Sequence, residues 1–312
     1  MTLLEPTSAS PDRALAALRW AAVCADEPAR LEDPAPKVST AEWLAVPVAQ
    51  LRAELDALMV HRRGVEEALE ALQRAGFFVA WLPEIEAMIG MTDGEWKHKD
   101  VWKHTKQVVK QSVPRLSVRW GALLHDIGKP RTRKIDERGR VTFHGHAELG
   151  ARMFKRKVGT RLGFEGELGE RVHFLILHHL RPSQYEESWT DAAVRRFYKQ
   201  MGEGLKDLLD LGRADITTKR PAKKKRGIQN IADLKKRVVA LQKEDAQVKP
   251  LPKGLGLAIS ERFGVPPSKR LGELMTELEQ CAYGGEVEFQ QDFEHYLAFL
   301  AEHRERFGLP ST

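Results

Sequence analysis

Residues 121–130 read GALLHDIGKP, an apolar run that ends in an adjacent histidine and aspartate. Imidazole and carboxylate are ligand types that transition metals share, and two of them at a helix end point into one pocket. Gly128 is expected to stop the helix, Lys129 supplies a cation, and Pro130 prevents the helix from resuming. The stretch therefore predicts a helix that delivers His125 and Asp126 into a metal pocket.

The composition describes an ordinary globular chain. It has 312 residues, 42% of them hydrophobic, enough to bury a substantial core in about two domains or one multi-lobed body. Cys24 and Cys281 are the only cysteines, which excludes a disulfide framework and a thiolate zinc cluster and favours a reducing cytoplasm. The N-terminus lacks the pattern of a signal peptide, and no apolar run approaches the roughly 20 residues that cross a bilayer. We therefore expect a soluble, cytoplasmic protein with no membrane partner.

The charge of the chain is compatible with a polyanionic partner. The formal net charge is +6 and the isoelectric point is about 9.2, a balance that many proteins share without binding nucleic acid. Positive charge is concentrated in residues 219–226, which hold Lys219, Arg220, Lys223, Lys224, Lys225 and Arg226. Such a run predicts either a solvated loop or a loop that contacts phosphates, and the sequence alone leaves both open.

Almost every segment has helical periodicity. A cap and a first-turn proline at residues 10–12 open a first helix, and apolar stripes follow at 48–59 and 65–72. Further helices are predicted over residues 100–109, 116–127, 147–157, 168–180, 192–201, 205–215, 228–243, 257–263, 268–282 and 289–307. The β signal is confined to residues 132–135 and 140–143 around a turn, which predicts a small hairpin. The chain is therefore predicted to be all-α with one hairpin.

Histidine and aspartate residues recur where these helices begin or end. The candidate metal ligands are His104, His125, Asp126, His146, His178, His179 and Asp215. Their separations are too long for a zinc finger but suit a bundle in which several helices each contribute an inward-facing side chain. Taken singly, each histidine is more often a hydrogen-bonded core residue, and the pair at 178–179 could serve a helix dipole instead. Two core carboxylates, however, need a partner cation, which a metal supplies to both.

The order of these residues resembles that of the HD-domain metal-dependent phosphohydrolases, in which a histidine, a His-Asp pair, further histidines and a final aspartate follow one another. The matching segments are DVWKHT at 100–105, LHDIGKP at 124–130, FHGH at 143–146, HHLRP at 178–182 and RAD at 213–215. The resemblance implies a helical HD-domain bundle with the small hairpin, flanked by N- and C-terminal helical regions.

The resemblance also implies a role for each side chain. The metal ligands would be His104, His125, Asp126 and Asp215 for one divalent ion and Asp126, His146 and His178 for a second, about 3.5–4 Å from the first. Asp126, Lys129 and His179 would be catalytic, although the pattern does not distinguish His178 from His179, and Lys129 and Arg181 would hold the phosphate. Ligands without thiolate suit manganese, nickel, iron, cobalt, magnesium and zinc. The identity of the metal and the number of ions, one or two, therefore stay open.

A second resemblance extends over nearly the whole chain. Segments at 14–22, 51–55, 72–76 and 82–85 look like the neck and body of bacterial tRNA nucleotidyltransferases, the CCA-adding enzymes, and poly(A) polymerases, and segments between 250 and 287 look like their C-terminal region. The Gly-Gly or Gly-Ser turn and Asp-x-Asp pair of their catalytic head are not found, so we do not expect nucleotide addition by this chain alone. We predict a neck- and body-like region at 1–90, an HD domain at 91–218 and a helical tail at 219–312.

These observations predict a metal-dependent phosphohydrolase or phosphodiesterase that acts on nucleotides or on RNA ends carrying a 2′,3′-cyclic or terminal phosphate. Lys223, Lys224 and Lys225 would help to bind RNA, including tRNA. The alternative is a non-catalytic RNA-binding body that works beside a separate nucleotidyltransferase and holds a structural metal. A deoxynucleotide triphosphohydrolase or a cyclic-dinucleotide phosphodiesterase is less favoured, because the segments around the ligands look like the nucleotidyltransferase branch. The sequence leaves the oligomeric state open.

Overall fold

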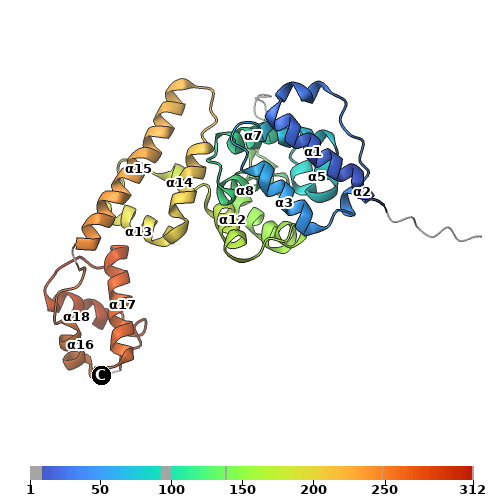
Figure 1. Ribbon diagram of the computed structural model, residues 1–312. Coiled ribbons are helices and arrows are strands. Elements are labelled where there is room, and N and C mark those ends of the chain that lie inside the picture. The colour runs from blue at the N-terminus through green and yellow to red at the C-terminus, as the bar shows by residue number, and fades with distance from the viewer. Residues whose placement is uncertain (1–8, 93–99, 138, 248, 311–312) are drawn as a thin grey trace, which may run out of the picture. The chain divides into compact units, whose positions relative to one another are not determined.

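The computed structural model of the chain describes residues 9–92, 100–137, 139–247 and 249–310. These residues form two compact units (Figure 1), the first from residues up to Gln184 together with Lys206–Ile228, and the second from Tyr185–Leu205 together with residues from Gln229 onward. All residues of the predicted metal cluster belong to the first unit. The division of the sequence into regions 1–90, 91–218 and 219–312 stays a prediction.

The first unit is helical, as predicted. Its helices are α1 (Asp12–Asp26), α2 (Thr40–Leu44), α3 (Val48–Met59), α4 (Val65–Arg74), α5 (Phe77–Trp81), α6 (Pro83–Glu86), α7 (Val101–Gln111), α8 (Leu116–Leu124), α9 (Lys129–Thr132), α10 (His146–Met153), α11 (Gly159–Arg161), α12 (Gly166–His178) and α14 (Leu205–Ala214). Short 3-10 turns cover Pro28–Glu32 and Pro182–Gln184, and a π-helical turn, Phe154–Val158, follows α10.

The predicted hairpin is present. Strand β1 (Lys134–Ile135) pairs with β2 (Val141–Thr142) in antiparallel register, with Lys134 opposite Thr142. Among the described residues these two strands make the one sheet of the fold, which is therefore all-α with a small hairpin.

Helix α8 forms the centre of the first unit. Every residue from Ser117 to Leu124 is buried, and the helix packs against α3, α7 and α12. Its Arg119 is 1% exposed and donates hydrogen bonds to backbone carbonyls of Ser112, at the end of α7, and of Met59, at the end of α3. Burial lowers the pKa of Arg119 to about 10. This side chain satisfies carbonyls that the helix ends leave unpaired and fixes α7 and α3 to α8.

Helix α14 is tied to the same frame by polar contacts. Gln111 of α7 donates to the backbone carbonyl of Ala214 at 2.7 Å, and Arg115 contacts Asp207 and, at 3.1 Å, Asp210. These contacts fix the end of α14, and with it Asp215, relative to α7 and α8.

The basic run does not form the predicted loop. Helix α15 (Pro221–Gln247) begins seven residues earlier than the predicted start at 228, so Lys223, Lys224 and Lys225 lie in its first turns. Pro221 at the first helical position has a backbone angle suited to a helix start, and lysine, arginine and alanine are good helix formers. This part of the sequence prediction is wrong, because a run of lysine and arginine is also compatible with the first turns of a helix.

The second unit is also helical. It contains α13 (Asp191–Met201), a 3-10 turn (Gly202–Gly204), the later part of α15, and α16 (Leu255–Phe263), α17 (Lys269–Gly284) and α18 (Phe293–Glu302). Its C-terminal helices share one apolar core around Ile259, Leu278 and Leu300. Helix α18 is shorter than the predicted 289–307, because Asp292 caps its start through the His295 amide. No helix in the described ranges is long and apolar enough to cross a membrane.

Candidate metal centre

Four side chains from three segments of the first unit meet beside α8. His104 comes from the first turn of α7, His125 and Asp126 follow the last residue of α8, and Asp215 follows α14. Asp100 caps α7 by accepting a hydrogen bond from the amide of Lys103, which sets the start of the helix that carries His104. His104 and His125 are 21 positions apart along the chain, and Asp215 is farther still, so helix packing brings the three segments together.

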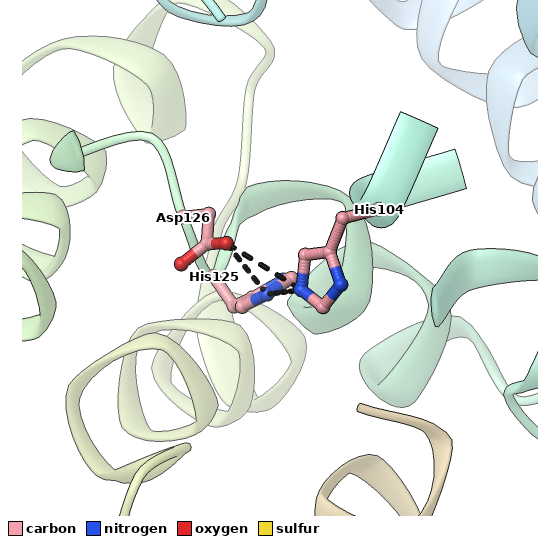
Figure 2. A group of neighbouring side chains, drawn as sticks. All are labelled: His104, His125 and Asp126. Carbon is pink, nitrogen blue, oxygen red and sulfur yellow. Dashed lines mark hydrogen bonds and ion pairs between the residues drawn. The ribbon is translucent and has the colours of Figure 1, made fainter. Parts of the chain in front are cut away.

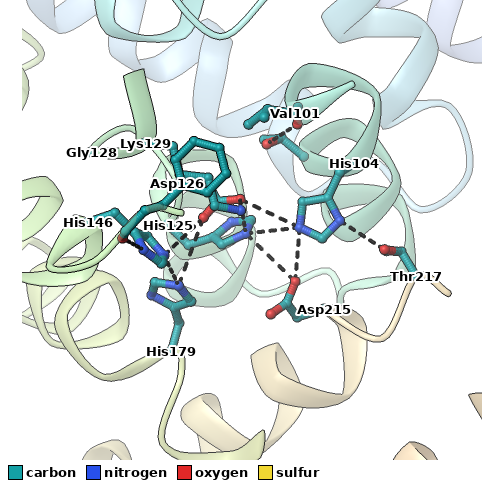
Figure 3. A network of polar contacts seen from close by, with 12 residues as sticks. Val101, His104, His125, Asp126, Gly128, Lys129, His146, His179, Asp215 and Thr217 are labelled. Atoms are coloured by element: carbon teal, nitrogen blue, oxygen red, sulfur yellow. Dashed lines mark hydrogen bonds and ion pairs between the residues drawn. The ribbon is translucent and has the colours of Figure 1, made fainter. Parts of the chain in front are cut away.

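The first group of potential ligand atoms is compact (Figure 2). His104 Nε2 and His125 Nε2 are 3.3 Å apart, and they lie 3.6 and 3.1 Å from Asp126 Oδ2. Asp215 Oδ1 lies 3.0 Å from His104 Nε2 and 3.7 Å from His125 Nε2. Figure 3 shows the two carboxylates on opposite sides of the imidazole pair. His104, His125 and Asp126 alone already form a group that could hold a metal ion.

A second group shares Asp126 with the first. His146 is the first residue of α10 and His179 follows the last residue of α12. Their Nε2 atoms are 3.1 Å apart and lie 3.4 and 3.9 Å from the other oxygen of the same carboxylate, Asp126 Oδ1. This group too could hold a metal ion, so the two oxygens of one carboxylate face two separate sets of imidazoles (Figure 3).

The orientation of each ring leaves Nε2 free to bind a cation. The Nδ1 atoms of His125, His146 and His179 each donate to the backbone carbonyl three residues earlier, at 2.7, 2.8 and 2.8 Å. His104 Nδ1 instead pairs with the Thr217 hydroxyl at 2.8 Å. In a neutral ring with Nδ1 protonated, Nε2 carries only a lone pair. Without a cation, the nearby Asp126 and Asp215 outweigh burial and raise the pKa of His125. Once the four rings are neutral with Nδ1 protonated, four Nε2 lone pairs face the carboxylates, an arrangement typical of metal-binding histidines.

Electrostatics keep both carboxylates charged, although Asp126 is buried and Asp215 is only 26% exposed. Burial alone would raise the pKa of Asp126, but the neighbouring His125 and Lys129 outweigh it and hold this pKa well below its usual range. Burial likewise opposes ionisation of Asp215, but its contacts with His104 and His125 lower the pKa to about 2. Burial and the charge on His125 lower the pKa of His179 to about 4, so that this ring is neutral at pH 7. Anionic oxygens and neutral imidazole are the forms that bind metals.

One orphaned atom supports a metal in the second group. Asp126 is 1% exposed, and its Oδ1 has no hydrogen-bond partner in the described part of the chain. It faces the lone pairs of His146 and His179, and such a group of electron-rich atoms is repulsive unless a cation lies among them. Ligands about 2.1 Å from a metal are roughly 3.0–3.4 Å apart in octahedral or tetrahedral sites. The observed spacings of 3.0–3.9 Å are close to these values, so the donor set fits divalent cations.

The structure brings His179, and not His178, to Asp126. The His178 ring instead packs on Phe174, with 4.7 Å between ring centroids, and burial together with the charge of Arg181 lowers its pKa. Successive side chains on a helix point about 100° apart, and at the end of α12 it is the His179 ring that faces the cluster while the His178 ring points toward Phe174. The assignment of His178 to the metal set thus disagrees with its placement.

The other predicted site residues divide into near and distant groups. Lys129 Nζ lies 2.5 Å from Asp126 Oδ2 and 5.5 Å from the ring centroid of Phe143. Arg181 donates its amide to the carbonyl of His178 at 2.9 Å. Lys223, Lys224 and Lys225 lie in α15 and are not part of the cluster.

Two residues of the centre were not predicted. Thr217 contacts His104, and its only sequence signal is its position two residues after Asp215. Gly128 was expected to stop a helix, but α8 already ends at Leu124, and Gly128 instead packs so closely on α10 that a Cβ atom there would lie 2.1 Å from the His146 carbonyl oxygen. The absence of a side chain lets the segment after Asp126 approach the start of α10.

Comparison with known proteins identifies this part of the chain. Residues 97–219 match the family model described as HD domain. The chain contains an HD domain. The match begins just before the helix that carries His104 and ends just after Thr217, so it includes both ligand groups.

The HD domain lies within a longer similarity to tRNA nucleotidyltransferases. The A-adding tRNA nucleotidyltransferase of Deinococcus radiodurans is 31% identical over 261 residues, which cover 81% of this chain and 58% of that protein. The CC-adding tRNA nucleotidyltransferase of Thermus thermophilus is 34% identical over 172 residues, covering 53% of this chain and 38% of that protein. The chain thus spans about half the length of these curated relatives and is homologous to them over most of its own length.

Proposed function

We propose that the chain is a metal-dependent phosphohydrolase or phosphodiesterase that acts on nucleotides or RNA ends bearing a 2′,3′-cyclic or terminal phosphate. The observation that carries the proposal is the shared carboxylate, since Asp126 presents one oxygen to His104 and His125 and the other to His146 and His179. A purely structural metal would need one closed set of ligands, whereas two adjacent sets are typical of phosphoester hydrolysis.

In this proposal the first ion is held by His104, His125, Asp126 and Asp215, and the second by Asp126, His146 and His179. His179 replaces His178 in the metal set because its Nε2 faces Asp126 Oδ1. When bound, divalent cations supply a Lewis acid that polarises a phosphoryl oxygen and makes water a better nucleophile at neutral pH. The identity of the ions stays open.

The remaining residues act on the substrate. Lys129, 20% exposed at its side chain and next to Asp126, is placed to contact a phosphate and to stabilise charge that develops on it. Asp126 orients Lys129 through their ion pair, and Arg181 adds a second cation for the phosphate. Burial of Asp126 and His125 limits access of bulk water, which strengthens these electrostatic interactions.

An RNA substrate is supported by the charge of the chain and by its relatives. Two relatives are named for the addition of nucleotides to tRNA. Lys223 and Lys225 are exposed in the first turns of α15, where the positive end of the helix dipole adds to their charge, and they would contact backbone phosphates with Lys224. The cytoplasmic location predicted from the sequence agrees with such a substrate.

The proposal is tested by turnover in the presence of Mn²⁺. Wild-type protein should hydrolyse bis-p-nitrophenyl phosphate and 2′,3′-cyclic AMP, and Asp126→Asn should reduce kcat/KM by about 100-fold or more because both ligand sets lose a charged oxygen. Circular dichroism establishes that the variant is folded. No turnover by the wild type with Mn²⁺, Co²⁺, Ni²⁺ or Mg²⁺, together with tight tRNA binding, would instead support a non-catalytic RNA-binding body with a structural metal.

A further inference from the structure

The segment that joins the two halves of the metal cluster is rich in cations. Residues 129–144, here called the hairpin segment, run from Lys129 through β1 and β2 to His144. Residues 129–140 contain six lysine and arginine residues and two acidic residues, a net charge of +4, whereas the net charge of the whole chain is +6. This short segment therefore carries a local excess of positive charge.

Both ends of the hairpin segment are fixed at the centre. At its start, Lys129 contacts Asp126, and at its end the backbone of His146 packs directly against Gly128. Arg131 and Arg133 follow Lys129 by two and four residues, so their backbones lie within about 7 and 14 Å of it even if the chain were fully extended. Their long side chains can reach phosphates on either side of one held at Lys129.

Three of these cations have no other evident role. Arg131, Arg133 and Lys134 are exposed and have no ionic partner within the described ranges of the chain. Arg140 differs, because it pairs with Asp136 at 2.7 Å and so stabilises the hairpin itself. Exposed cations without an internal partner raise the local potential and attract a polyanion.

Ring side chains lie at the other end of the same segment. Phe143 is half-buried beneath the Lys129 ammonium, whereas the neighbouring His144 is exposed. Imidazole and phenyl rings are surfaces on which single-stranded bases stack. Strand β2 runs back along β1 and brings Phe143 to Lys129, so the exposed ring of the next residue, His144, lies near the start of the run of cations. Cations beside an exposed ring can bind the phosphates and stack on the bases of a nucleic acid strand.

We propose that the hairpin segment binds the nucleotides next to the reacting phosphate, so that the HD centre acts on the end of a single-stranded oligoribonucleotide in preference to a mononucleotide. Arg131, Arg133 and Lys134 hold the flanking phosphates, and His144 stacks on a base. This inference rests on the proposed function for its reaction but not for its binding surface.

The experiment compares wild type with Arg131→Ala/Arg133→Ala/Lys134→Ala. A fluorescein-labelled 12-nucleotide RNA ending in a 2′,3′-cyclic phosphate should bind the variant at least about 10-fold more weakly, by fluorescence anisotropy at 50 mM salt, and the slope of log Kd against log salt should fall by roughly 2. kcat/KM for this RNA should fall in parallel, while kcat/KM for 2′,3′-cyclic AMP stays within about 2-fold, because a mononucleotide lacks the flanking phosphates.

A matched control removes the same charge elsewhere. Lys155, Arg156 and Lys157 are exposed beyond the end of α10, roughly 13 Å along the helical chain from His146, and their triple alanine variant should bind the RNA like the wild type. Equal weakening by both triple variants, or none by the hairpin variant, would overturn the inference. If the wild type turns over none of the substrates, the proposed function fails, but the anisotropy comparison still decides whether the hairpin segment binds RNA. Retained thermal melting of each variant excludes a folding defect.

Discussion

Replacement of Thr217 by valine should weaken metal binding without unfolding the protein. The Thr217 hydroxyl lies 2.8 Å from His104 Nδ1, and it is the only side chain that orients a cluster histidine in the described structure, since the other three use backbone carbonyls. Valine has nearly the same shape but cannot accept the imidazole proton. His104 would then be free to turn or to change tautomer, and its Nε2 would no longer be held toward the metal.

The expected loss of metal affinity follows from the removal of one hydrogen bond to a metal ligand, made by a residue that does not itself bind the metal. Such losses reduce metal affinity by about 10- to 100-fold, or about 1.4–2.7 kcal/mol, and the partial exposure of the His104 side chain, 22%, favours the lower half of this range. Isothermal titration with Mn²⁺ measures the effect directly. Thr217→Ser keeps the hydroxyl and should restore affinity to within about 3-fold.

The neighbouring threonine provides a matched control. The Thr218 hydroxyl accepts from the amide of Arg220 and has no contact with the cluster, so Thr218→Val should leave Mn²⁺ affinity unchanged. If Thr217→Val binds Mn²⁺ as tightly as the wild type does, or if both valine variants weaken it equally, the idea that Thr217 orients His104 is refuted.

Three further predictions concern stability and ligand identity. Gly128→Ala should lower the free energy of unfolding in urea by about 1–3 kcal/mol, since its Cβ would overlap a backbone oxygen of α10, and an unchanged midpoint would contradict this close contact. Burial alone would raise the pKa of Glu84, but its hydrogen bonds with Arg161 outweigh burial and lower this pKa below 4.5. The ion pair therefore stabilises the fold fully above pH 4.5, and this stabilisation is lost as the pH falls through the lowered pKa. Glu84→Gln should therefore cost about 2–3 kcal/mol at pH 7 and less at pH 3.5 in urea titrations, and a pH-independent difference would argue against the ion pair. His179→Ala should weaken Mn²⁺ binding at least about 10-fold in calorimetry while His178→Ala changes it by less than about 2-fold, and the reverse order would restore the original assignment.

The fold class and most of the cluster could be predicted because their signals are local. Apolar periodicity indicates each helix, and the adjacent His125 and Asp126 at the end of a buried run mark the pocket. The candidates His104, His146 and Asp215 each lie at a helix start or end, where the bundle brings them to that pocket.

The remainder depended on three-dimensional packing that no local pattern contains. The choice between His178 and His179 follows from the rotation of α12 about its axis, which packing against α8 and α10 determines. The role of Gly128 follows from contact with a segment 18 residues away, and that of Thr217 from contact with α7. The start of α15 was missed because lysine-rich runs occur both in loops and in helices.

The central claim is that Asp126 bridges two metal ions in one centre. Crystals soaked in MnCl₂ and measured at a wavelength with strong manganese anomalous scattering test it directly. Two anomalous peaks, one between Asp126 Oδ2 and the imidazoles of His104 and His125 and one between Oδ1 and the imidazoles of His146 and His179, are the predicted result. Peaks elsewhere, or none beside Asp126 at saturating Mn²⁺, would contradict the account.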